Sequence, residues 1–310
     1  MSLRNPLVLK TPHYSFYSKK ISHKVKIALL ADLHLNPVIA DRQLELIKSA
    51  FKKEIPDIII IHGDLFDTPL SLDIKEHTEK LTKTLKYCSS IAPTLTTLGN
   101  HDQILHTRHH PESYEEFLKF VPPEKELLEK WHSLCDKAEV KLLLDDWFVF
   151  KDVNIFGFFE PYDCYYSEAK KGENNAKISA KLEKTKSLKS PPKKEAFTWF
   201  FSHAPFKILF DQPTLSSFDV LSFGHTHGGA VPLLLDGIFD KIGYHGGLVA
   251  PYGNLFPTKK TRGKETLKSG QEIIINSGMV LTQSPNFKPF QYLNPLKAAE
   301  ITFVSLCPEQ

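Results

Sequence analysis

The apolar residues of this chain fall into short runs that end abruptly at polar residues. The clearest run is four consecutive isoleucines at 58–61, followed at once by His62, Gly63 and Asp64. Four β-branched residues in a row indicate a strand that is buried on both faces, as in the centre of an α/β sheet. The carboxyl end of such a strand is where an α/β protein places its chemistry. Taken alone, Asp64 is better explained by an Asx turn that ends the strand.

Strands and helices are predicted to alternate over the first hundred residues. Strands are expected at 25–31 and 94–98 as well as at 58–62, and amphipathic helices at 37–54 and 74–91 lie between them. This order and spacing are typical of parallel βαβ units. Residues 1–20 lack a clear period, and we expect them to form an arm that packs on the body of the protein.

After residue 103 the regular alternation is interrupted by insertions. Residues 103–138 are predicted to form an inserted helical cap, with helices at 114–120 and 125–136. Residues 160–195 are predicted to form a flexible, lysine-rich lid, because 169–194 contain too few apolar residues for a core and favour at most a short helix around Ala180. Further strands are expected at 141–144, 147–151, 153–158, 196–202, 218–223, 271–276 and 299–304, with a glycine-rich loop region at 237–270. Together, residues 1–310 are predicted to form one domain.

Composition and charge narrow the function classes modestly. The formal net charge of +3 over 310 residues is too small to imply a nucleic-acid partner by itself. Four cysteines without CxxC spacing favour buried thiols in a reducing compartment over a disulfide framework or a thiolate zinc site. No apolar run reaches the length of a membrane span, and residues 1–26 lack the apolar stretch of a signal peptide. We therefore expect a cytoplasmic protein, with peripheral binding to the inner face of the inner membrane as an alternative.

Five predicted strand ends carry side chains that bind divalent metal ions in proteins. They are Asp32-x-His34, Gly63-Asp64-x-x-Asp67, Gly99-Asn100-His101-Asp102, His203 and Gly224-His225-x-His227. In an extended segment the side chains at i and i+2 point the same way, so both members of such a pair can face one cluster. Carboxylate, amide and imidazole ligands together suit Mn²⁺, Fe²⁺ or Zn²⁺. A lone His-x-His pair is more often a surface loop, but five sets that each follow a buried strand are very unlikely to arise by chance.

These motifs resemble those of the calcineurin-type metallophosphoesterase superfamily, which run D-x-H, G-D-x-x-D, G-N-H-D/E, H and G-H-x-H. The resemblance implies an α/β fold in which two mixed β-sheets pack as a sandwich flanked by helices. It also implies two divalent metal ions per chain, for which we expect Mn²⁺, with Fe²⁺ or Zn²⁺ as alternatives. The implied ligands of one ion are Asp32, His34, Asp64 and His227, and those of the other are Asp64, Asn100, His203 and His225.

The resemblance implies that His101 and Asp102 serve catalysis rather than ligation. His101 would contact the scissile phosphate or protonate the leaving group, and Asp102 would orient the His101 ring. Two neighbouring ions lower the pKa of a shared water and stabilise the attacking and leaving oxygens of a displacement at phosphorus. For Asp67 we favour a supporting contact over direct ligation, and we expect His62 to be structural.

Residues 224–229 and the long loop after them are similar to a narrower bacterial branch, that of the YkuE- and YaeI-type phosphoesterases. This branch includes a UDP-2,3-diacylglucosamine pyrophosphatase of lipid A biosynthesis, the LpxG type, which releases UMP and lipid X (2,3-diacylglucosamine 1-phosphate). The resemblance thus implies a nucleotide-linked glycolipid as the substrate. This chain departs from the branch at Ala230, where glutamine is usual, and in its long 103–136 stretch. The alternatives are a general phosphodiesterase on nucleotides or phospholipids and, in another class, a non-catalytic protein-docking module.

Candidate substrate contacts are few. Arg108 and Arg262 are the best bidentate phosphate ligands, and no long basic stripe suggests nucleic acid as the substrate. Phe159 is a candidate wall of an apolar groove for acyl chains, although ordinary core or cap packing explains it better. Other candidates for this groove are Phe117, Leu118, Phe120, Val121, Phe156, Phe158, Phe206, Leu209 and Phe210. The lysines of 170–194 would suit phosphate or an anionic membrane surface, the alternative being a solvated loop.

Overall fold

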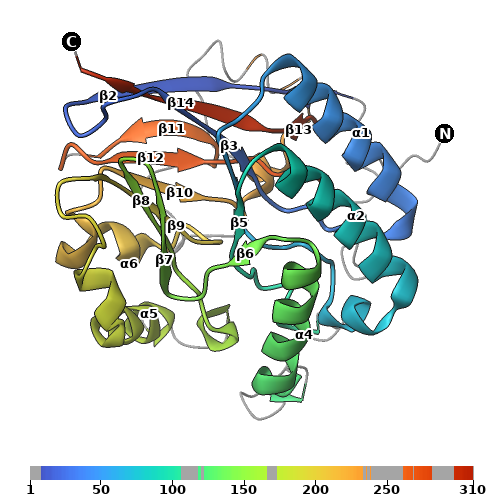
Figure 1. Ribbon diagram of the computed structural model, residues 1–310. Helices are drawn as coiled ribbons and strands as arrows, with labels where there is room; N and C mark the ends of the chain where they lie inside the picture. The colour runs from blue at the N-terminus through green and yellow to red at the C-terminus, as the bar shows by residue number, and fades with distance from the viewer. Residues whose placement is uncertain are drawn as a thin grey trace.

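Two six-stranded β-sheets pack face to face in the computed structural model of the protein (Figure 1). The structure describes residues 8–105, 118–119, 122–165, 173–232, 235, 238, 261–267, 269–280 and 297–309. The first sheet runs, in spatial order, through β2 (His13–Ser18), β14 (Thr302–Pro308), β3 (Val25–Leu30), β4 (Ile58–Ile61), β5 (Thr94–Thr96) and β6 (Lys141–Leu142). The second runs through β11 (Gly263–Thr266), β12 (Glu272–Ile275), β10 (Val220–Phe223), β9 (Phe197–Phe201), β8 (Val153–Gly157) and β7 (Asp146–Phe150).

Both sheets are mixed, which confirms the predicted fold class. In the first sheet β3, β4, β5 and β6 are parallel, while β14 is antiparallel to β3 and parallel to β2. In the second sheet β8, β9, β10 and β12 are parallel, and the outer strands β7 and β11 are antiparallel to their neighbours. A separate two-stranded ladder joins β1 (Leu9–Lys10) to β13 (Ala299–Glu300).

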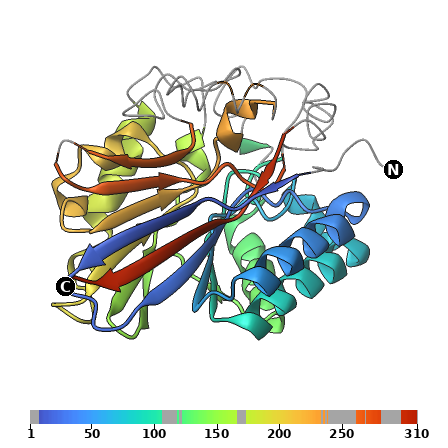
Figure 2. The ribbon, with the colours of Figure 1, turned by 90° about the horizontal axis from the view of Figure 1, so that it is seen from above.

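Helices cover the outer faces of both sheets (Figure 2). The first sheet is covered by α1 (Pro37–Lys53), α2 (Lys75–Ile91) and α4 (Glu124–Lys137), and the second by α5 (Glu173–Lys184) and α6 (Lys207–Phe210). Short 3₁₀ helices are η1 (Pro69–Asp73), η2 (Tyr162–Tyr165), η3 (Lys186–Lys189), η4 (Pro213–Leu215) and η5 (His227–Ala230). No described helix has both the length and the apolar character needed to cross a membrane.

Strand β4 shows why the isoleucine run is needed at the centre of this architecture. Ile58 and Ile60 pack in the apolar cluster between the two sheets, whereas Ile59 and Ile61 pack in the cluster under α1 and α2. All four side chains are completely buried, and each contributes about 1.5–3 kcal/mol relative to an exposed position. The strand therefore has no solvent-facing side that could carry polar residues.

The N-terminal arm is more regular than its sequence suggests. Residues 13–18, within the arm expected to pack on the body, form the edge strand β2, which pairs parallel with β14. Within β2, Phe16 alone is buried, at 8% exposure, so the weak apolar alternation reflects an edge strand with one face toward solvent. Residues 299–304 were expected to form one strand, but they divide at Ile301 between β13 and β14.

The lysine-rich segment also has more structure than predicted, because twelve residues form α5 where at most a short helix was expected. Ile178 and Leu182, four positions apart, are fully buried, and Leu188 is 3% exposed. They pack with aromatic residues on the outer face of the second sheet. The indole N–H of Trp147 donates to the Ser187 carbonyl at 2.6 Å. A role as a lid stays a prediction.

The predicted cap at 103–138 is described in part. Its second predicted helix is α4, which packs against α2 and the first sheet through Leu127, Trp131 and Leu134. The Trp131 indole N–H also donates to the Asp102 carbonyl at 3.2 Å, which ties α4 to the loop after β5. Most of the predicted helix at 114–120 lies outside the described residues. Whether 103–138 acts as a cap therefore stays a prediction.

Candidate metal centre

Five strand ends from the two sheets converge at one edge of the sandwich. From the first sheet come the loops after β3, β4 and β5, and from the second come those after β9 and β10. Backbone hydrogen bonds join the loops, because the Asp32 amide donates to Gly63 O at 3.2 Å and the His34 amide to Asp64 O at 2.9 Å. All seven predicted ligands lie in this region.

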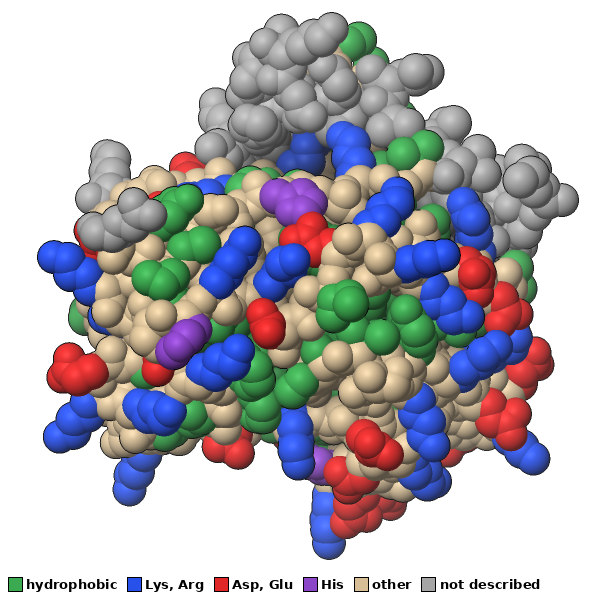
Figure 3. Space-filling view, turned by 45° about the horizontal axis from the view of Figure 1, so that its top comes forward, with side chains coloured by type: hydrophobic (Ala, Val, Ile, Leu, Met, Phe, Trp, Pro, Cys, Tyr) green, Lys and Arg blue, Asp and Glu red, His purple; other side chains and the backbone are tan. Residues whose placement is uncertain are grey.

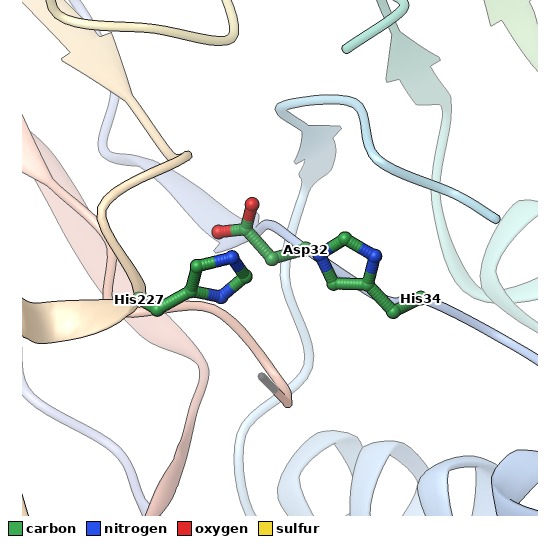
Figure 4. Close-up of side chains that lie close together, drawn as sticks. All are labelled: Asp32, His34 and His227. Atoms are coloured by element: carbon green, nitrogen blue, oxygen red, sulfur yellow. The ribbon is translucent and has the colours of Figure 1, made fainter. Parts of the chain in front are cut away.

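The first group of metal-type side chains is Asp32, His34 and His227. One ligand atom from each lies within 4.8 Å of the other two, and all three residues are buried. The two imidazoles approach Asp32 from opposite sides of the close-up in Figure 4, with ring centroids 5.1 Å apart. His227 Nδ1 donates to Val280 O at 2.9 Å, which leaves Nε2 as its free ligand atom.

The second group is Asp64, His203 and His225, again with ligand atoms within 4.8 Å of one another. His203 Nε2 lies 3.2 Å from Asp64 Oδ2, 3.0 Å from Asn100 Oδ1 and 3.0 Å from His225 Nδ1. His203 Nδ1 donates to the His62 carbonyl at 2.6 Å, which sets the orientation of the ring. Asp64 also approaches the first group, since its Oδ2 is 3.6 Å from His34 Nε2.

The charges and donor atoms of this cluster fit divalent cations. Asp64 Oδ2 and His34 Nε2 are buried polar atoms without a hydrogen-bond partner among the described residues, as expected for atoms that ligate an ion. Burial alone would lower the pKa of His34, but Asp67 and the two other carboxylates raise it to about 9. Against the same effect of burial, Asp64 raises the pKa of His203 to about 10. The carboxylates thus strongly favour positive charge at these two positions.

The remaining ligands have pKa shifts that follow from burial and from neighbouring charges. Burial, with a smaller contribution from His203, lowers the pKa of His225 to about 3. Burial, together with the charge of His34, lowers the pKa of His227 well below its usual value. Both imidazoles are therefore in the neutral form that ligates a metal. Burial raises the pKa of Asp32 to about 6, whereas the surrounding imidazoles outweigh burial and hold that of Asp64 well below its usual value.

Five of the predicted ligands have a strained backbone. Asp32, His34, Asp64, His225 and His227 have φ between 40° and 68°, the left-handed region that non-glycine residues seldom adopt. Each such residue costs roughly 1–3 kcal/mol, and such conformations cluster at active sites and ligand clamps. Here the conformation turns the chain sharply at the strand end and directs the side chain into the shared cluster.

Two glycines allow the carboxylates to be approached this closely. A Cβ at Gly99 would collide with Asp64 Oδ1, and one at Gly278 would lie 2.5 Å from Asp32 Oδ2. Gly278 also has a φ of 74°, so a side chain there would be strained as well as crowded. The Gly-Asn-His-Asp motif therefore needs its glycine to let the loop after β5 pack against Asp64.

His101 lies in the cluster, but a different group orients it from the one predicted. Its amide donates to Asp64 Oδ1 at 2.9 Å, and its Nδ1 donates to the Asp67 carbonyl at 3.0 Å. Asp102 was expected to orient this ring. Instead its carboxylate accepts the amides of Leu65 and Phe66 at 2.9 and 3.1 Å and of Gly99 at 2.9 Å, so it fixes two loops. A ligand atom of His101 also lies within 4.8 Å of those of His34 and Asp64, closer to ligating positions than predicted.

Asp67 and His62, in the loop after β4, make contacts of the supporting and structural kinds expected for them. Asp67 Oδ1 lies 3.0 Å from His34 Nδ1, the carboxylate–histidine contact that orients a metal ligand. His62 joins the two sheets, because its Nδ1 donates to Leu30 O at 2.9 Å and its Nε2 lies 2.8 Å from Ser222 Oγ.

The structure describes two of the three candidate substrate residues, and these two lie in different surroundings. Arg108 lies outside the described residues. Arg262 is 9% exposed and lines a cavity beside His227, and its Nη1 is 3.4 Å from Gly228 O. Phe159 is 7% exposed and packs in the core cluster of the first sheet, with the Lys181 ammonium 4.5 Å from its ring centroid. Four of the other groove candidates are likewise buried in a core cluster, namely Phe156, Phe158, Phe206 and Leu209.

One buried carboxylate beside the cluster was missed from the sequence. Glu160 is fully buried, accepts the Ala204 amide at 2.9 Å and accepts a hydrogen bond from the Tyr165 hydroxyl. Burial raises the pKa of Glu160 to about 7, against the effect of nearby His203. Glu160 lies three residues after β8, at a further strand end beside β9, and this position could have indicated a site residue. The aromatic run before it suggests an apolar groove instead.

The calcineurin-like phosphoesterase family matches residues 25–229 of this chain, a range that contains every motif from Asp32 to His227. The chain belongs to this family. An uncharacterized metallophosphoesterase of Aquifex aeolicus is 26% identical over 96 residues, 30% of this chain and 35% of that protein. One of Campylobacter jejuni is 26% identical over 227 residues, 72% of this chain and 50% of that protein. The chain thus spans half or less of the length of these curated relatives.

Two solved structures that this chain matches share less of its sequence. A dimetal phosphatase from Danio rerio has 12% identity and a TM-score of 0.43, covering 84% of this chain and 90% of that one. An archaeal phosphodiesterase has 14% identity and a TM-score of 0.35, covering 82% and 84%. At these identities and TM-scores, the two structures do not indicate the substrate of this chain. The narrower bacterial branch suggested by residues 224–229 stays a hypothesis.

Proposed function

We propose that this phosphoesterase hydrolyses a phosphodiester or phosphoanhydride bond with the help of two divalent metal ions. The observation that supports it most directly is the shared position of Asp64 Oδ2, 3.6 Å from His34 Nε2 and 3.2 Å from His203 Nε2. A carboxylate between two sets of imidazoles is suited to bridging two cations, whose binding would displace the protons that the carboxylates favour on His34 and His203. One ion would take Asp32, His34, Asp64 and His227, and the other Asp64, Asn100, His203 and His225.

The protein's own groups supply position and proton transfer. Two divalent ions in such a site provide positive charge for the phosphoryl oxygens and increase the acidity of water. His101, whose Nδ1 donates to the Asp67 carbonyl, would contact a phosphoryl or leaving-group oxygen through Nε2. Burial lowers the pKa of His101, which makes its protonated form a stronger acid toward a departing oxygen. Asp102 contributes indirectly by holding the loops of Asp64 and His101 together.

Hydrolysis of bis(4-nitrophenyl) phosphate tests the reaction class. After treatment with a chelator, the full chain should be inactive, and Mn²⁺, Fe²⁺ or Zn²⁺ should restore release of 4-nitrophenol. The most effective of the three identifies the preferred ion, for which we propose Mn²⁺. Hydrolysis that persists in the chelator, or that none of the ions restores, contradicts the proposal.

At the level of substrate, the candidate is UDP-2,3-diacylglucosamine, cleaved to UMP and lipid X. Its support is the similarity of residues 224–229 to the bacterial branch, together with the basic cavity beside His227. The burial of Phe159 and its aromatic neighbours weakens it, because these side chains would have to leave the core to hold acyl chains. Release of UMP from this glycolipid with Mn²⁺ is the test. Turnover of simple nucleotide diesters in its place would indicate the general phosphodiesterase instead.

The surface charge favours a small substrate over nucleic acid. On the face shown in Figure 3, lysine and arginine side chains are interspersed with aspartate, glutamate and apolar side chains and do not form a continuous basic stripe. A groove that follows a nucleic-acid backbone needs such a stripe, with aromatic residues on which bases stack. We therefore propose a phosphate-containing small molecule as the ligand, with contact to a membrane surface as a further possibility for a lipid-linked one.

A further inference from the structure

A cavity of about 560 Å³ adjoins the metal centre on the side of His227. Its walls come from distant parts of the chain, since β1 and β2 of the N-terminal arm meet the start of β11 and residues 297–300 there. This volume lies within the range of about 300–1,000 Å³ that is usual for pockets that bind small molecules. His227 and Gly228 form part of the wall, so the cavity and the cluster of ligands share a boundary.

Positive charge dominates the described lining of this cavity. The wall includes four cationic side chains, Lys10, Arg262, Lys264 and Lys297, and one carboxylate, Glu300. Glu300 Oε1 accepts hydrogen bonds from the Ser277 amide at 3.2 Å and the Thr302 hydroxyl at 2.9 Å, so this carboxylate is already bound by groups of the protein. The remaining polar groups of the wall include the Ser277 and Tyr14 side chains, whose hydroxyls can donate to an anion.

Two of the cations are held against the loops of the metal ligands. The Lys297 ammonium, on a residue that is 4% exposed, donates to Gly278 O at 3.1 Å. Gly278 in turn packs directly on the Asp32 carboxylate. Arg262 Nη1 is 3.4 Å from the carbonyl of Gly228, the residue after His227. The basic wall therefore begins where the set of ligands ends.

Lys10 and Lys264 lie on separate strands, and the contacts of Lys297 with Gly278 and of Arg262 with Gly228 do not involve them. Lys264 is in β11, where its ammonium lies 3.4 Å from Glu272 Oε2 and 4.2 Å from the Phe16 ring centroid. Lys10 is in β1. Both lysines line the cavity. Substituting them changes the charge of the cavity without touching a residue of the metal centre.

We propose that this cavity binds a second phosphoryl group, carried by the same molecule whose phosphoester is placed at the metal centre. Several lysine and arginine side chains around one volume suit the oxygens of a phosphate. A group covalently attached to the scissile phosphorus has to leave the centre past His227 to enter the cavity. Preferred substrates are therefore diesters or anhydrides with an additional phosphate. This inference rests on the proposed function and specifies its substrate class.

Two matched chromogenic diesters test this proposal on the Mn²⁺-loaded full chain. They are thymidine 3′-(4-nitrophenyl phosphate) and the same compound with a 5′-phosphate, which present the same leaving group. The unaltered protein should show a kcat/KM at least about tenfold higher for the compound with the 5′-phosphate, the effect of one charge-assisted contact. In the variant Lys10→Gln/Lys264→Gln the ratio of the two kcat/KM values should fall toward one. Lys130→Gln, which removes a lysine of α4 paired with Asp73, is the control and should keep the original ratio.

The possible failures are distinguishable. If both compounds are hydrolysed equally well, or if the double variant keeps the original ratio, the proposed phosphate site is wrong while the hydrolase assignment stands. If neither compound is hydrolysed, the proposed function fails, and calorimetry of thymidine 3′,5′-bisphosphate against thymidine 3′-phosphate still tests the cavity. Tighter binding of the bisphosphate that is lost in the double variant supports the site, and equal binding contradicts it. Inorganic phosphate that binds with the same affinity as the bisphosphate and depends on the same two lysines would identify a site for free phosphate and overturn the proposal.

Discussion

Asp64 is the residue on which the account of the metal centre depends most. Its carboxylate is fully buried, and its Oδ2 faces one imidazole from each sheet. Its backbone has a φ of 50°, and its Oδ1 accepts the His101 amide at 2.9 Å. One side chain thus joins both groups of ligands and the loop of His101.

Asp64→Asn should remove both ions from the protein. The amide retains the shape of the side chain but lacks the charge needed to bridge two cations. Metal analysis should find less than half of the content of the unaltered protein, and kcat/KM should fall by more than the ~100-fold typical for loss of a supporting residue. Asp41→Asn, at an exposed aspartate paired with Lys80, is the matched control and should change neither. Full metal content in Asp64→Asn contradicts the bridging role.

His101→Asn separates a catalytic role from ligation. We expect the variant to keep its metal content and to lose about 10²–10⁴-fold in kcat, because general acid–base catalysis by a positioned side chain contributes this much. This measurement is needed because a ligand atom of His101 lies within 4.8 Å of ligand atoms of His34 and Asp64, so the geometry also allows His101 to be a ligand. Loss of one ion together with activity would show that His101 is a ligand.

Asp67→Asn tests the support of His34. The carboxylate lies 3.0 Å from His34 Nδ1, and its loss should weaken metal affinity by about 10–100-fold without abolishing the fold. Titration of the chelator-treated protein with Mn²⁺ measures the change. Unchanged affinity would mean that the Asp67 contact does not orient the ligand.

At the level of elements, strands and helices with strong periodicity could be predicted from the sequence. The isoleucine run of β4 and the apolar stripes of α1 and α2 can be recognised locally. In each, the spacing of apolar residues close together in the sequence determines which face is buried. The edge strands β2 and β11 are half exposed, so their pattern resembles that of a loop. In α5 two buried residues among many lysines suffice, because the partner surface comes from the second sheet.

Leu182→Ala should show whether α5 is part of the core. The side chain is fully buried, so its truncation should lower the free energy of unfolding by about 2–5 kcal/mol. Lys184→Ala on the same helix is exposed and should change it by less than about 0.5 kcal/mol. Urea denaturation at a fixed metal concentration measures both. A Leu182→Ala variant as stable as the unaltered protein would favour the mobile lid that the composition suggests.

At the scale of the whole molecule, the site depends on contacts that no local pattern encodes. The ligand types could be predicted because each follows a recognisable strand, but their supports come from residues distant in sequence. Asp102 holds the amides of Leu65 and Phe66, and Lys297 contacts the loop that packs on Asp32. Glu160 is held by the loop after the neighbouring strand β9, and the basic cavity forms where β1 and β2 meet β11 and residues 297–300.

Because each sheet supplies part of the ligand set, metal binding should stabilise the packing of the two sheets. Asp32 and Asp64 follow strands of the first sheet, whereas His203, His225 and His227 follow strands of the second. Mn²⁺ at 100 times its dissociation constant should add about 2.7 kcal/mol per site to the free energy of unfolding. Thermal unfolding with Mn²⁺ and with a chelator measures this difference. Asp64→Asn should lose it, and an equal shift in that variant would place the stabilising ion elsewhere.

The most direct measurement is an anomalous difference map from crystals of the full chain grown with Mn²⁺. Two peaks about 3.5–4 Å apart should lie on either side of the Asp64 carboxylate, one beside Asp32, His34 and His227 and the other beside Asn100, His203 and His225. A single peak, or peaks that do not contact Asp64, would contradict the two-ion centre and with it the proposed hydrolysis.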